Sequence, residues 1–353
     1  MIREGIQKLV EKTNLTSDEA QAIMREIMSG KATNAQISAF LTALRMKGET
    51  VEELIAFATV MKENCRRIQP NVKGRLVDTC GTGGDKIKTF NVSTTAAFVA
   101  AGAGVPIAKH GNRSVTSQSG SADVLEKLGF NLNMSPEAVQ RAIEQIGVGF
   151  MFAPAFHPAM KYAVEPRREI GIRTVFNILG PLVNPASANA QLLGAYDRQL
   201  ILPLAYTLKN LGCEEAMVVH GLDGLDEVST IGKTAIAWLR EKEVATLEIT
   251  PKELGIKKGR MEDVKGTTPE ESAELLFKIL SGQCPFADPK MEMVLANSAA
   301  VLIVGGRADD FGYAMEAARK SIESGAAYEK LKALIKASGG CLSKLEELEQ
   351  KYA

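Results

Sequence analysis

The chain has 353 residues, of which 45% are hydrophobic and 24% charged, so it is long enough to bury one large core beside a smaller domain. Its 42 basic residues balance 42 acidic ones and only 5% are aromatic, which argues against a nucleic-acid-binding groove. The sequence contains no stretch of about 20 apolar residues, no apolar signal segment at its start and no cysteine framework, so we expect a cytoplasmic protein without a membrane span.

Residues 1 to about 68 have the pattern of a small helical bundle. Apolar residues recur at helical spacing, for example at Ile37, Phe40, Leu41 and Leu44. Three capping boxes mark helix starts, because a threonine hydroxyl can accept from an early backbone N–H while an acid or amide three residues later reaches back. These boxes pair Thr16 with Glu19, Thr33 with Gln36, and Thr50 with Glu53.

The pattern changes at Pro70, where short apolar segments begin to alternate with helical ones. The strand candidates are residues 75–78, 106–108, 149–152, 191–195 and 216–219. Such alternation predicts a mostly parallel central sheet flanked by helices, an α/β fold. Residues 228–250 predict an antiparallel addition, Ser135-Pro136 opens a helix, and helices are expected from about Met291 to the end. We therefore expect a small all-helical domain at 1–69, which helices from about 165–185 could join, and a larger α/β domain at 70–353.

A glycine-rich turn, Gly81-Thr82-Gly83-Gly84-Asp85, follows the first strand candidate. Glycines let several backbone N–H groups point into one concavity, which suits a phosphate, although an ordinary turn is an equally good reading of this segment alone. The segment lacks the Gly-Lys-Ser/Thr of a P-loop, and Lys86 stands where a dinucleotide fingerprint needs its third glycine. Nucleoside triphosphates and nicotinamide cofactors are therefore poor candidates.

Two further segments add donors for a polyanion. Asn91, Ser93, Thr94 and Thr95 open an apolar helix with more hydroxyl and amide groups than capping alone requires. Residues 109–117, Lys-His-Gly-Asn-Arg-Ser-Val-Thr-Ser, follow a strand candidate and so would lie at the carboxyl edge of the sheet, where open α/β sheets bind ligands. The first segment therefore predicts a phosphate or a metal, and the second predicts a polyanion.

Two clusters of charged residues remain. Asp223, Asp226 and Glu227 place three carboxylates within five positions, which predicts either a Mg²⁺ site or a solvated acidic loop. Arg167, Arg168 and Arg173 could hold a carboxylate, and each could equally be a surface cation.

Taken in order, these motifs closely resemble those of the anthranilate phosphoribosyltransferase family. The shared motifs are Gly-Thr-Gly-Gly-Asp at 81–85, Asn-Val-Ser-Thr at 91–94, Lys-His-Gly-Asn-Arg at 109–113, Asn-Ile-Leu-Gly-Pro-Leu at 177–182 and Asp226-Glu227. The resemblance implies a helical domain joined to an α/β domain, a homodimer packed through the helical part, and phosphoribosyl diphosphate and anthranilate as substrates. It also implies two magnesium ions per monomer.

The resemblance further implies the residues of each subsite. Arg167 is preferred to Arg168 because the family's arginine lies four residues before a glycine that Gly171 matches. Anthranilate would contact Gly81, Asn112 and Arg167, with His110 near its entrance, and the metal would be held by Ser93, Asp226 and Glu227. Phosphoribosyl diphosphate would contact Gly81, Gly84, Asp85, Thr89, Asn91, Val92, Ser93, Thr94, Lys109, His110, Gly111, Asn112, Arg113, Ser114, Val115, Thr116, Ser117 and Ser121.

Two alternatives stay open at this point. A pyrimidine-nucleoside phosphorylase shares the expected architecture and a related phosphate loop, but the Asp226-Glu227 pair and the 109–113 motif favour a metal-bound diphosphate donor. A catalytically silent relative that binds nucleic acid is disfavoured by the zero formal charge. We expect no catalytic acid or base, since electrostatic stabilisation by Lys109 and magnesium would suffice.

Overall fold

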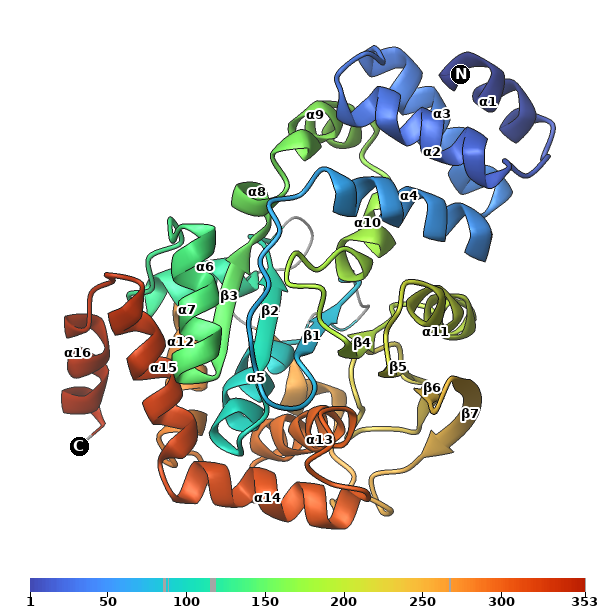
Figure 1. The fold of residues 1–353 in the computed structure, drawn as a ribbon. Helices are drawn as coiled ribbons and strands as arrows, with labels where there is room; N and C mark the ends of the chain where they lie inside the picture. Colours follow the sequence, from blue (N-terminus) through green and yellow to red (C-terminus); the bar gives the residue numbers. More distant parts are fainter. Residues whose placement is uncertain (85–86, 88, 115–118, 267, 353) are drawn as a thin grey trace.

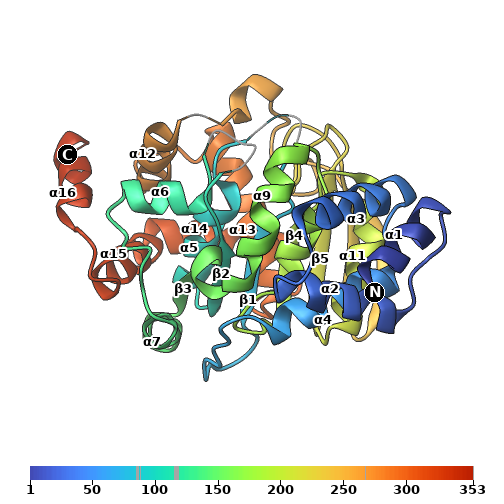
Figure 2. The ribbon, with the colours of Figure 1, turned by 90° about the horizontal axis from the view of Figure 1, so that it is seen from above.

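The computed structural model describes residues 1–84, 87, 89–114, 119–266 and 268–352. Four N-terminal helices lie at one end of the molecule, a seven-stranded sheet lies in the middle, and the C-terminal helix lies at the opposite end (Figures 1 and 2). Among the described residues no helix is long and apolar enough to cross a bilayer.

The N-terminal helices form as the local signals predict. Their bounds are α1 Ile2–Val10, α2 Ser17–Met28, α3 Asn34–Lys47 and α4 Val51–Glu63. All three predicted capping boxes are present, each with both of its hydrogen bonds. The rings of Phe40 and Phe57 meet edge to face at 6.0 Å inside the bundle, and α9 (Lys161–Ile170) packs against α2 and α3.

This bundle does not have a hydrophobic core of its own. Its buried residues belong to one cluster with Phe176 and Leu179 of α10 (Phe176–Leu179), with α11 (Ile201–Asn210) and with one face of the sheet. The division of the chain at residue 69 and the joining of residues 165–185 to the helical part stay predictions.

The central sheet has the order β3-β2-β1-β4-β5-β6-β7. The first five strands in this order are parallel and the last two are antiparallel, which confirms the predicted mostly parallel sheet with an antiparallel addition. The strands are β1 Val77–Gly81, β2 Ile107–Gly111, β3 Val148–Phe152, β4 Ala190–Gly194, β5 Glu215–Gly221, β6 Thr234–Arg240 and β7 Glu243–Ile249. The antiparallel addition begins only at Thr234, because residues 228–233 form no strand and bend at 230–232.

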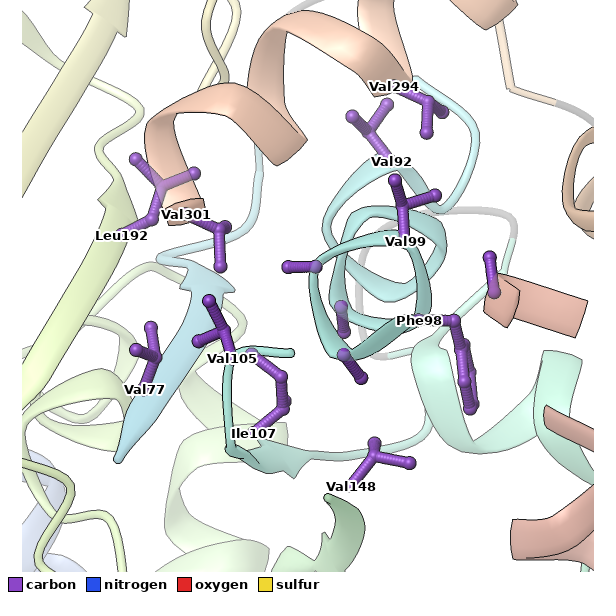
Figure 3. Packing of buried hydrophobic residues seen from close by; sticks show 14 of the residues in the cluster. Val77, Val92, Phe98, Val99, Val105, Ile107, Val148, Leu192, Val294 and Val301 are labelled. Carbon is purple, nitrogen blue, oxygen red and sulfur yellow. The ribbon is translucent and has the colours of Figure 1, made fainter. Parts of the chain in front are cut away.

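Helices cover both faces of this sheet, because successive strand side chains point to opposite faces. Leu192 and Met217 pack on the side of α5 (Val92–Gly102) and α13 (Pro289–Val304), whereas Leu193 and Val218 pack on the side of α11 and the N-terminal bundle. Figure 3 shows valines of β1, α5 and α13 meeting in the first of these layers. Because the five parallel strands are largely buried, a ligand would reach them most easily at their ends.

The remaining helices complete the outer layer. They are α6 Ser121–Lys127, α7 Pro136–Ile146, α8 Ala153–Phe156, α12 Pro269–Leu280, α14 Phe311–Glu323, α15 Ala326–Ala337 and α16 Ser343–Lys351. As predicted, Ser135 caps α7 and Pro136 is its first residue. The helix α12 was not predicted, although Thr268 and Glu271 form a capping box at its start.

Candidate active site

A cavity of about 310 Å³ lies at the carboxyl ends of β1, β2 and β5. The chain runs from β1 to β2 on one side and reaches β4 on the other, so the cavity lies at the point where the strand order reverses. The predicted site residues that line it are Gly81, Gly84, Thr89, Asn91, Val92, Ser93, Thr94, Lys109, His110, Gly111, Asn112, Arg113, Ser114, Ser121, Arg167, Asp226 and Glu227. The predicted residues Asp85, Val115, Thr116 and Ser117 lie outside the described residues.

The glycine turn after β1 is held from the neighbouring strand. The Thr82 N–H donates to the carbonyl of Gly194 at 2.8 Å, and the N–H of Tyr196 donates to the Thr82 hydroxyl at 3.0 Å. Gly83 and Gly84 have backbone φ angles of 68° and 79°, which residues with a side chain rarely adopt. Thr82 therefore attaches the described part of the turn, residues 81–84, to the end of β4 and the segment that follows it.

Glycine is also required at position 81 for a steric reason. A Cβ there would lie 2.6 Å from Asp226 Oδ2, and that same oxygen accepts from the N–H of Gly83 at 3.1 Å. The glycine turn and the acidic loop after β5 are thus packed directly together, although 143 residues separate them.

Arg173 is a neighbour of this turn whose position the sequence analysis did not predict. Its guanidinium donates to the carbonyl of Gly84 and lies over the ring of Tyr196, 4.4 Å from the ring centroid. A Cβ on Gly84 would come within 2.8 Å of Arg173. The sequence predicts Arg173 only as one of three arginines that could hold a carboxylate, and no local motif predicts its contact with the glycine turn.

Lys109 provides the buried cation of the cavity. Its Nζ donates to the carbonyl of Thr79 at 2.5 Å and to the hydroxyl of Ser93 at 3.3 Å. Burial lowers the pKa of Lys109, and burial raises the pKa of the nearby Asp78 carboxyl to about 6. The side-chain amide of Asn184 donates a hydrogen bond of 2.7 Å to the Asp78 carboxylate. The Lys109 ammonium group therefore contacts the hydroxyl-rich start of α5 through Ser93.

The three carboxylates of the acidic loop separate into two groups. Asp226 and Glu227 are buried and line the cavity. Asp223 instead accepts from the Ser229 hydroxyl at 2.5 Å and from the N–H of Leu225 at 3.2 Å, so it stabilises the loop itself. A pair of carboxylates that line a polar cavity, with Ser93 in the same wall, fits a Mg²⁺ ion that takes its other ligands from phosphate and water.

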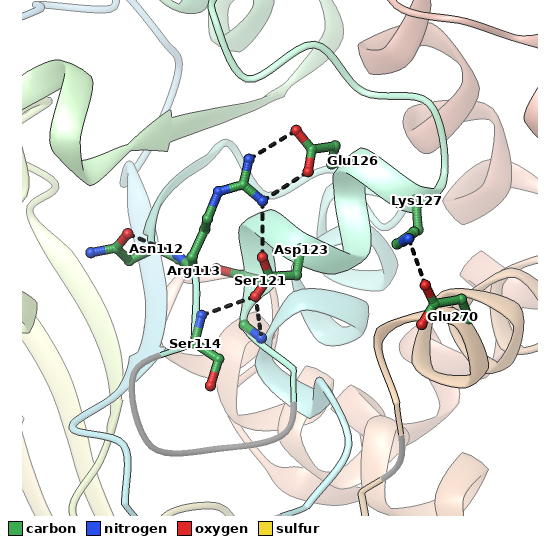
Figure 4. A network of polar contacts seen from close by, with 9 residues as sticks. Asn112, Arg113, Ser114, Ser121, Asp123, Glu126, Lys127 and Glu270 are labelled. Carbon is green, nitrogen blue, oxygen red and sulfur yellow. Dashed lines mark hydrogen bonds and ion pairs between the residues drawn. The ribbon is translucent and has the colours of Figure 1, made fainter.

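Arg113 points away from the glycine turn and toward α6. Figure 4 shows its guanidinium paired with Asp123 at 3.0 Å and with Glu126 at 2.8 Å. Hydrogen bonds to Glu126 and Asp123 raise the pKa of Arg113. Ser121, at the start of the same helix, donates through its hydroxyl to the carbonyl of Asn112 at 3.3 Å.

A second cavity, of about 320 Å³, adjoins the first. The two share His110, Asn112, Arg167 and Phe176 in their walls. The rest of the second wall is largely apolar and comes from α4, α8, α9 and the segments after α10: Met61, Ala153, Pro154, His157, Pro158, Met160, Lys161, Val164, Gly180 and Val183. Of the four residues predicted to bind anthranilate, His110, Asn112 and Arg167 line both the polar and the apolar cavity. Gly81 lines only the polar cavity.

Arg167 is suited to hold an anion in this shared wall. Its guanidinium lies 5.3 Å from the centroid of the Phe176 ring, and burial lowers its pKa. The neighbouring Arg168 is exposed and lines neither cavity. A carboxylate that replaces water around Arg167 would gain a charge-assisted contact, and the planar guanidinium allows that contact to be bidentate.

Two histidines of the apolar chamber are neutral at ordinary pH. The rings of His110 and His157 lie 5.0 Å apart, and burial lowers their pKa to about 3 and about 4. Within the described part of the chain, neither ring has a hydrogen-bond partner at Nε2.

The low pKa of His157 has a consequence for stability. A folded-state pKa of about 4, below the ordinary 6.5, means that between these values the unfolded chain binds a proton that the folded chain does not. The contribution is complete above pH 6.5 and is lost as the pH falls toward 4. We expect this residue to lower the free energy of unfolding by about 2 kcal/mol between pH 7.5 and 5.0.

The variant His157→Asn tests this expectation. Urea unfolding of both proteins at pH 7.5 and 5.0 should show a pH dependence that is weaker in the variant by this amount. Asp78 and the other titrating groups are common to both proteins, so they cancel in the difference. An equal pH dependence in the two proteins would contradict the burial argument.

Known proteins match this chain in sequence and in structure. The profiles described as "Glycosyl transferase family, helical bundle domain" and "Glycosyl transferase family, a/b domain" match residues 3–65 and 73–328. Anthranilate phosphoribosyltransferase of Alkaliphilus metalliredigens is 48% identical over 96% of this chain and 98% of its own.

Among solved structures, anthranilate phosphoribosyltransferase of Thermus thermophilus matches with a TM-score of 0.89 and 38% identity, over 95% of this chain and 99% of its own. The Saccharomyces cerevisiae enzyme in complex with PRPP and Mg matches with a TM-score of 0.87 and 29% identity, over 96% and 98%. The chain therefore belongs to the glycosyl transferase family and, within it, to the anthranilate phosphoribosyltransferases.

Proposed function

We propose that this protein transfers the 5-phosphoribosyl group of phosphoribosyl diphosphate to the amine of anthranilate, giving N-(5-phosphoribosyl)anthranilate and diphosphate in tryptophan biosynthesis. The observation that carries the proposal is the pair of adjoining cavities, one polar and one apolar, with Arg167 in the shared wall. A phosphorylated sugar suits the first chamber and an aromatic acid suits the second. The family membership of the chain supports the same reaction.

On the donor side, the glycine turn and the start of α5 would hold the diphosphate. The residues of the turn, Ser93 and Thr94 support this role because they line the cavity. Lys109 lines it as well and donates to the Ser93 hydroxyl. Such preorganised donors would stabilise the negative charge that the leaving diphosphate gains. No side chain has to act as a general acid.

On the acceptor side, Arg167 would bind the anthranilate carboxylate, and Asn112 and His110 would border the ring. Because His110 is neutral, it offers a hydrogen-bonding nitrogen to the aromatic amine without adding charge to the apolar chamber. These contacts would place the amine nitrogen behind the anomeric carbon, so that positioning provides most of the acceleration.

The reaction itself needs few participants. The bond between the anomeric carbon and the diphosphate oxygen breaks, the bond from that carbon to the amine nitrogen forms, and the amine releases one proton to solvent. An aryl amine is already neutral near pH 7, so no strong base has to prepare it. The oxocarbenium-like centre that forms would lie between the diphosphate and the amine.

Magnesium is part of the proposal, with Ser93, Asp226 and Glu227 as its protein ligands. A bound Mg²⁺ neutralises charge on the diphosphate oxygens. The two carboxylates would orient the diphosphate through it, and Asp226 would also keep the glycine turn in place through the N–H of Gly83. We extend the proposal to two ions per monomer, a homodimer packed through the helical domain and a cytoplasmic location.

One assay tests the proposed function. Anthranilate fluoresces, so its consumption can be followed when the protein is mixed with phosphoribosyl diphosphate and magnesium. We expect turnover that requires both substrates. Absence of turnover together with phosphorolysis of pyrimidine nucleosides would instead assign the protein to the nucleoside phosphorylases.

A further inference from the structure

Asp123 of α6 lies outside the cavity wall, but its carboxylate accepts hydrogen bonds from residues 113, 114 and 120, all of which line the cavity. Its Oδ2 accepts from the N–H of Ser114 at 2.9 Å and from the N–H of Gly120 at 3.0 Å. Its Oδ1 accepts from the Arg113 guanidinium at 3.0 Å. One carboxylate therefore joins the point where the chain leaves β2 to the point where it enters α6, as Figure 4 shows.

The two ends of this loop are in direct contact. A Cβ on Gly120 would overlap the nitrogen of Ser114 and would fall 2.7 Å from the carbonyl oxygen of Asn112. The Asn112 carbonyl also accepts from the Ala122 N–H at 3.2 Å. The position of Asn112, Arg113 and Ser114 in the cavity wall thus depends on how closely the start of α6 is held against them.

A carboxylate at the third position of a helix commonly accepts from the N-cap N–H, and this role alone would make Asp123 an ordinary cap. Asp123 differs because its other two donors, from residues 113 and 114, belong to the segment that follows β2. Glu19 is a useful comparison in the same chain. It accepts from the Thr16 N–H at 3.0 Å and from Lys8 of α1 at 2.6 Å, so it also joins two chain segments, but these lie in the N-terminal bundle and line neither of the two cavities described above.

We propose that Asp123 is a positioning residue for the phosphoribosyl donor, which acts by clamping the two ends of the loop that carries Asn112 and Ser114. Arg113 belongs to the same clamp, since its guanidinium is engaged by Asp123 and Glu126. The inference rests on the proposed function, because it names the donor subsite of that reaction as the part that depends on Asp123.

The test compares Asp123→Ala and Asp123→Asn with Glu19→Ala and Glu126→Gln. For each protein, binding of phosphoribosyl diphosphate with magnesium is measured by calorimetry, the KM of each substrate by anthranilate fluorescence, and Tm by thermal unfolding. Asp123→Ala should weaken donor binding and raise the donor KM about tenfold or more, since it removes hydrogen bonds to a charged group. The anthranilate KM should rise less than the donor KM, because Ser114 lines only the polar cavity whereas Asn112 lines both cavities.

The other variants separate positioning from stability. Asp123→Asn keeps one acceptor oxygen for the two loop N–H groups, so it should restore much of the donor affinity. Glu19→Ala should lower Tm by a similar amount to Asp123→Ala without changing donor affinity. Glu126→Gln should change donor affinity by less than about twofold, because it leaves both loop ends attached to Asp123.

Two results would overturn the inference. One is an Asp123→Ala protein whose donor affinity changes no more than that of Glu19→Ala, and the other is an equal rise in the KM of both substrates. If the unaltered protein binds the donor but does not consume anthranilate, the proposed function fails while the calorimetric comparison still decides the role of Asp123. If the unaltered protein does not bind the donor at all, both are refuted.

Discussion

Replacing Asp226 by Asn and Glu227 by Gln together should remove the response of donor binding to magnesium and lower kcat by about a thousandfold. Charge stabilisation by a bound metal contributes several kcal/mol to such reactions, and each 1.36 kcal/mol is a factor of about ten in rate. Both carboxylates are buried in the cavity wall beside the glycine turn, where they would hold the ion against the diphosphate. The amides keep the size of the side chains but remove their charge.

The control for this experiment is Asp223→Asn, an acidic residue of the same loop. Its carboxylate faces Ser229 and Leu225 rather than the cavity. This variant should lose stability yet keep the magnesium dependence. Calorimetric titration of phosphoribosyl diphosphate at a series of magnesium concentrations gives the comparison. A double variant whose magnesium dependence is unchanged would refute the metal site.

Replacing Arg167 by Ala should raise the KM for anthranilate about 10- to 100-fold and leave the KM for the donor nearly unchanged. Loss of a hydrogen bond to a charged group costs about 1.5–3 kcal/mol. The guanidinium stands in the wall between the polar and apolar cavities, so a carboxylate bound there would be shielded from water.

Arg168→Ala is the matched control, since it removes an arginine one position away that is exposed and lines neither cavity. Steady-state kinetics with each substrate varied in turn should show a wild-type anthranilate KM for this control. If Arg167→Ala weakens both substrates equally, the arginine supports the whole site rather than the acceptor carboxylate.

Much of the candidate site was predictable because its parts are local. The glycine turn, the start of α5 and the 109–113 segment each follow or precede a regular element, and parallel strands bring their carboxyl ends to one edge of the sheet. What the sequence left open was which members of a charged group face the ligand. Asp226 and Glu227 line the cavity while Asp223 does not, since the bends after β5 determine where each carboxylate points.

Other members of the site had no signal in the sequence. Arg173 contacts the glycine turn across 89 residues, and Asn184 reaches Asp78 across 106. Neither the spacing nor the residue type distinguishes them from surface residues, because the contacts form only when the segment around α10 packs against β1 and β2. Asp123 appeared in no motif, although it lies only ten residues from Arg113.

By itself the sequence determined the features that depend on neighbours three or four positions away: the capping boxes of α2, α3 and α4, the capped start of α7, and the alternation that produces a mostly parallel sheet. The tertiary structure alone decided that the helical bundle shares its core with the sheet, that a polar and an apolar cavity adjoin at Arg167, and that Asp123 joins two ends of a loop. The physical reason is the range of the interactions. A cap is complete within one helical turn, whereas a cavity wall requires elements far apart in the chain to meet at fixed distances.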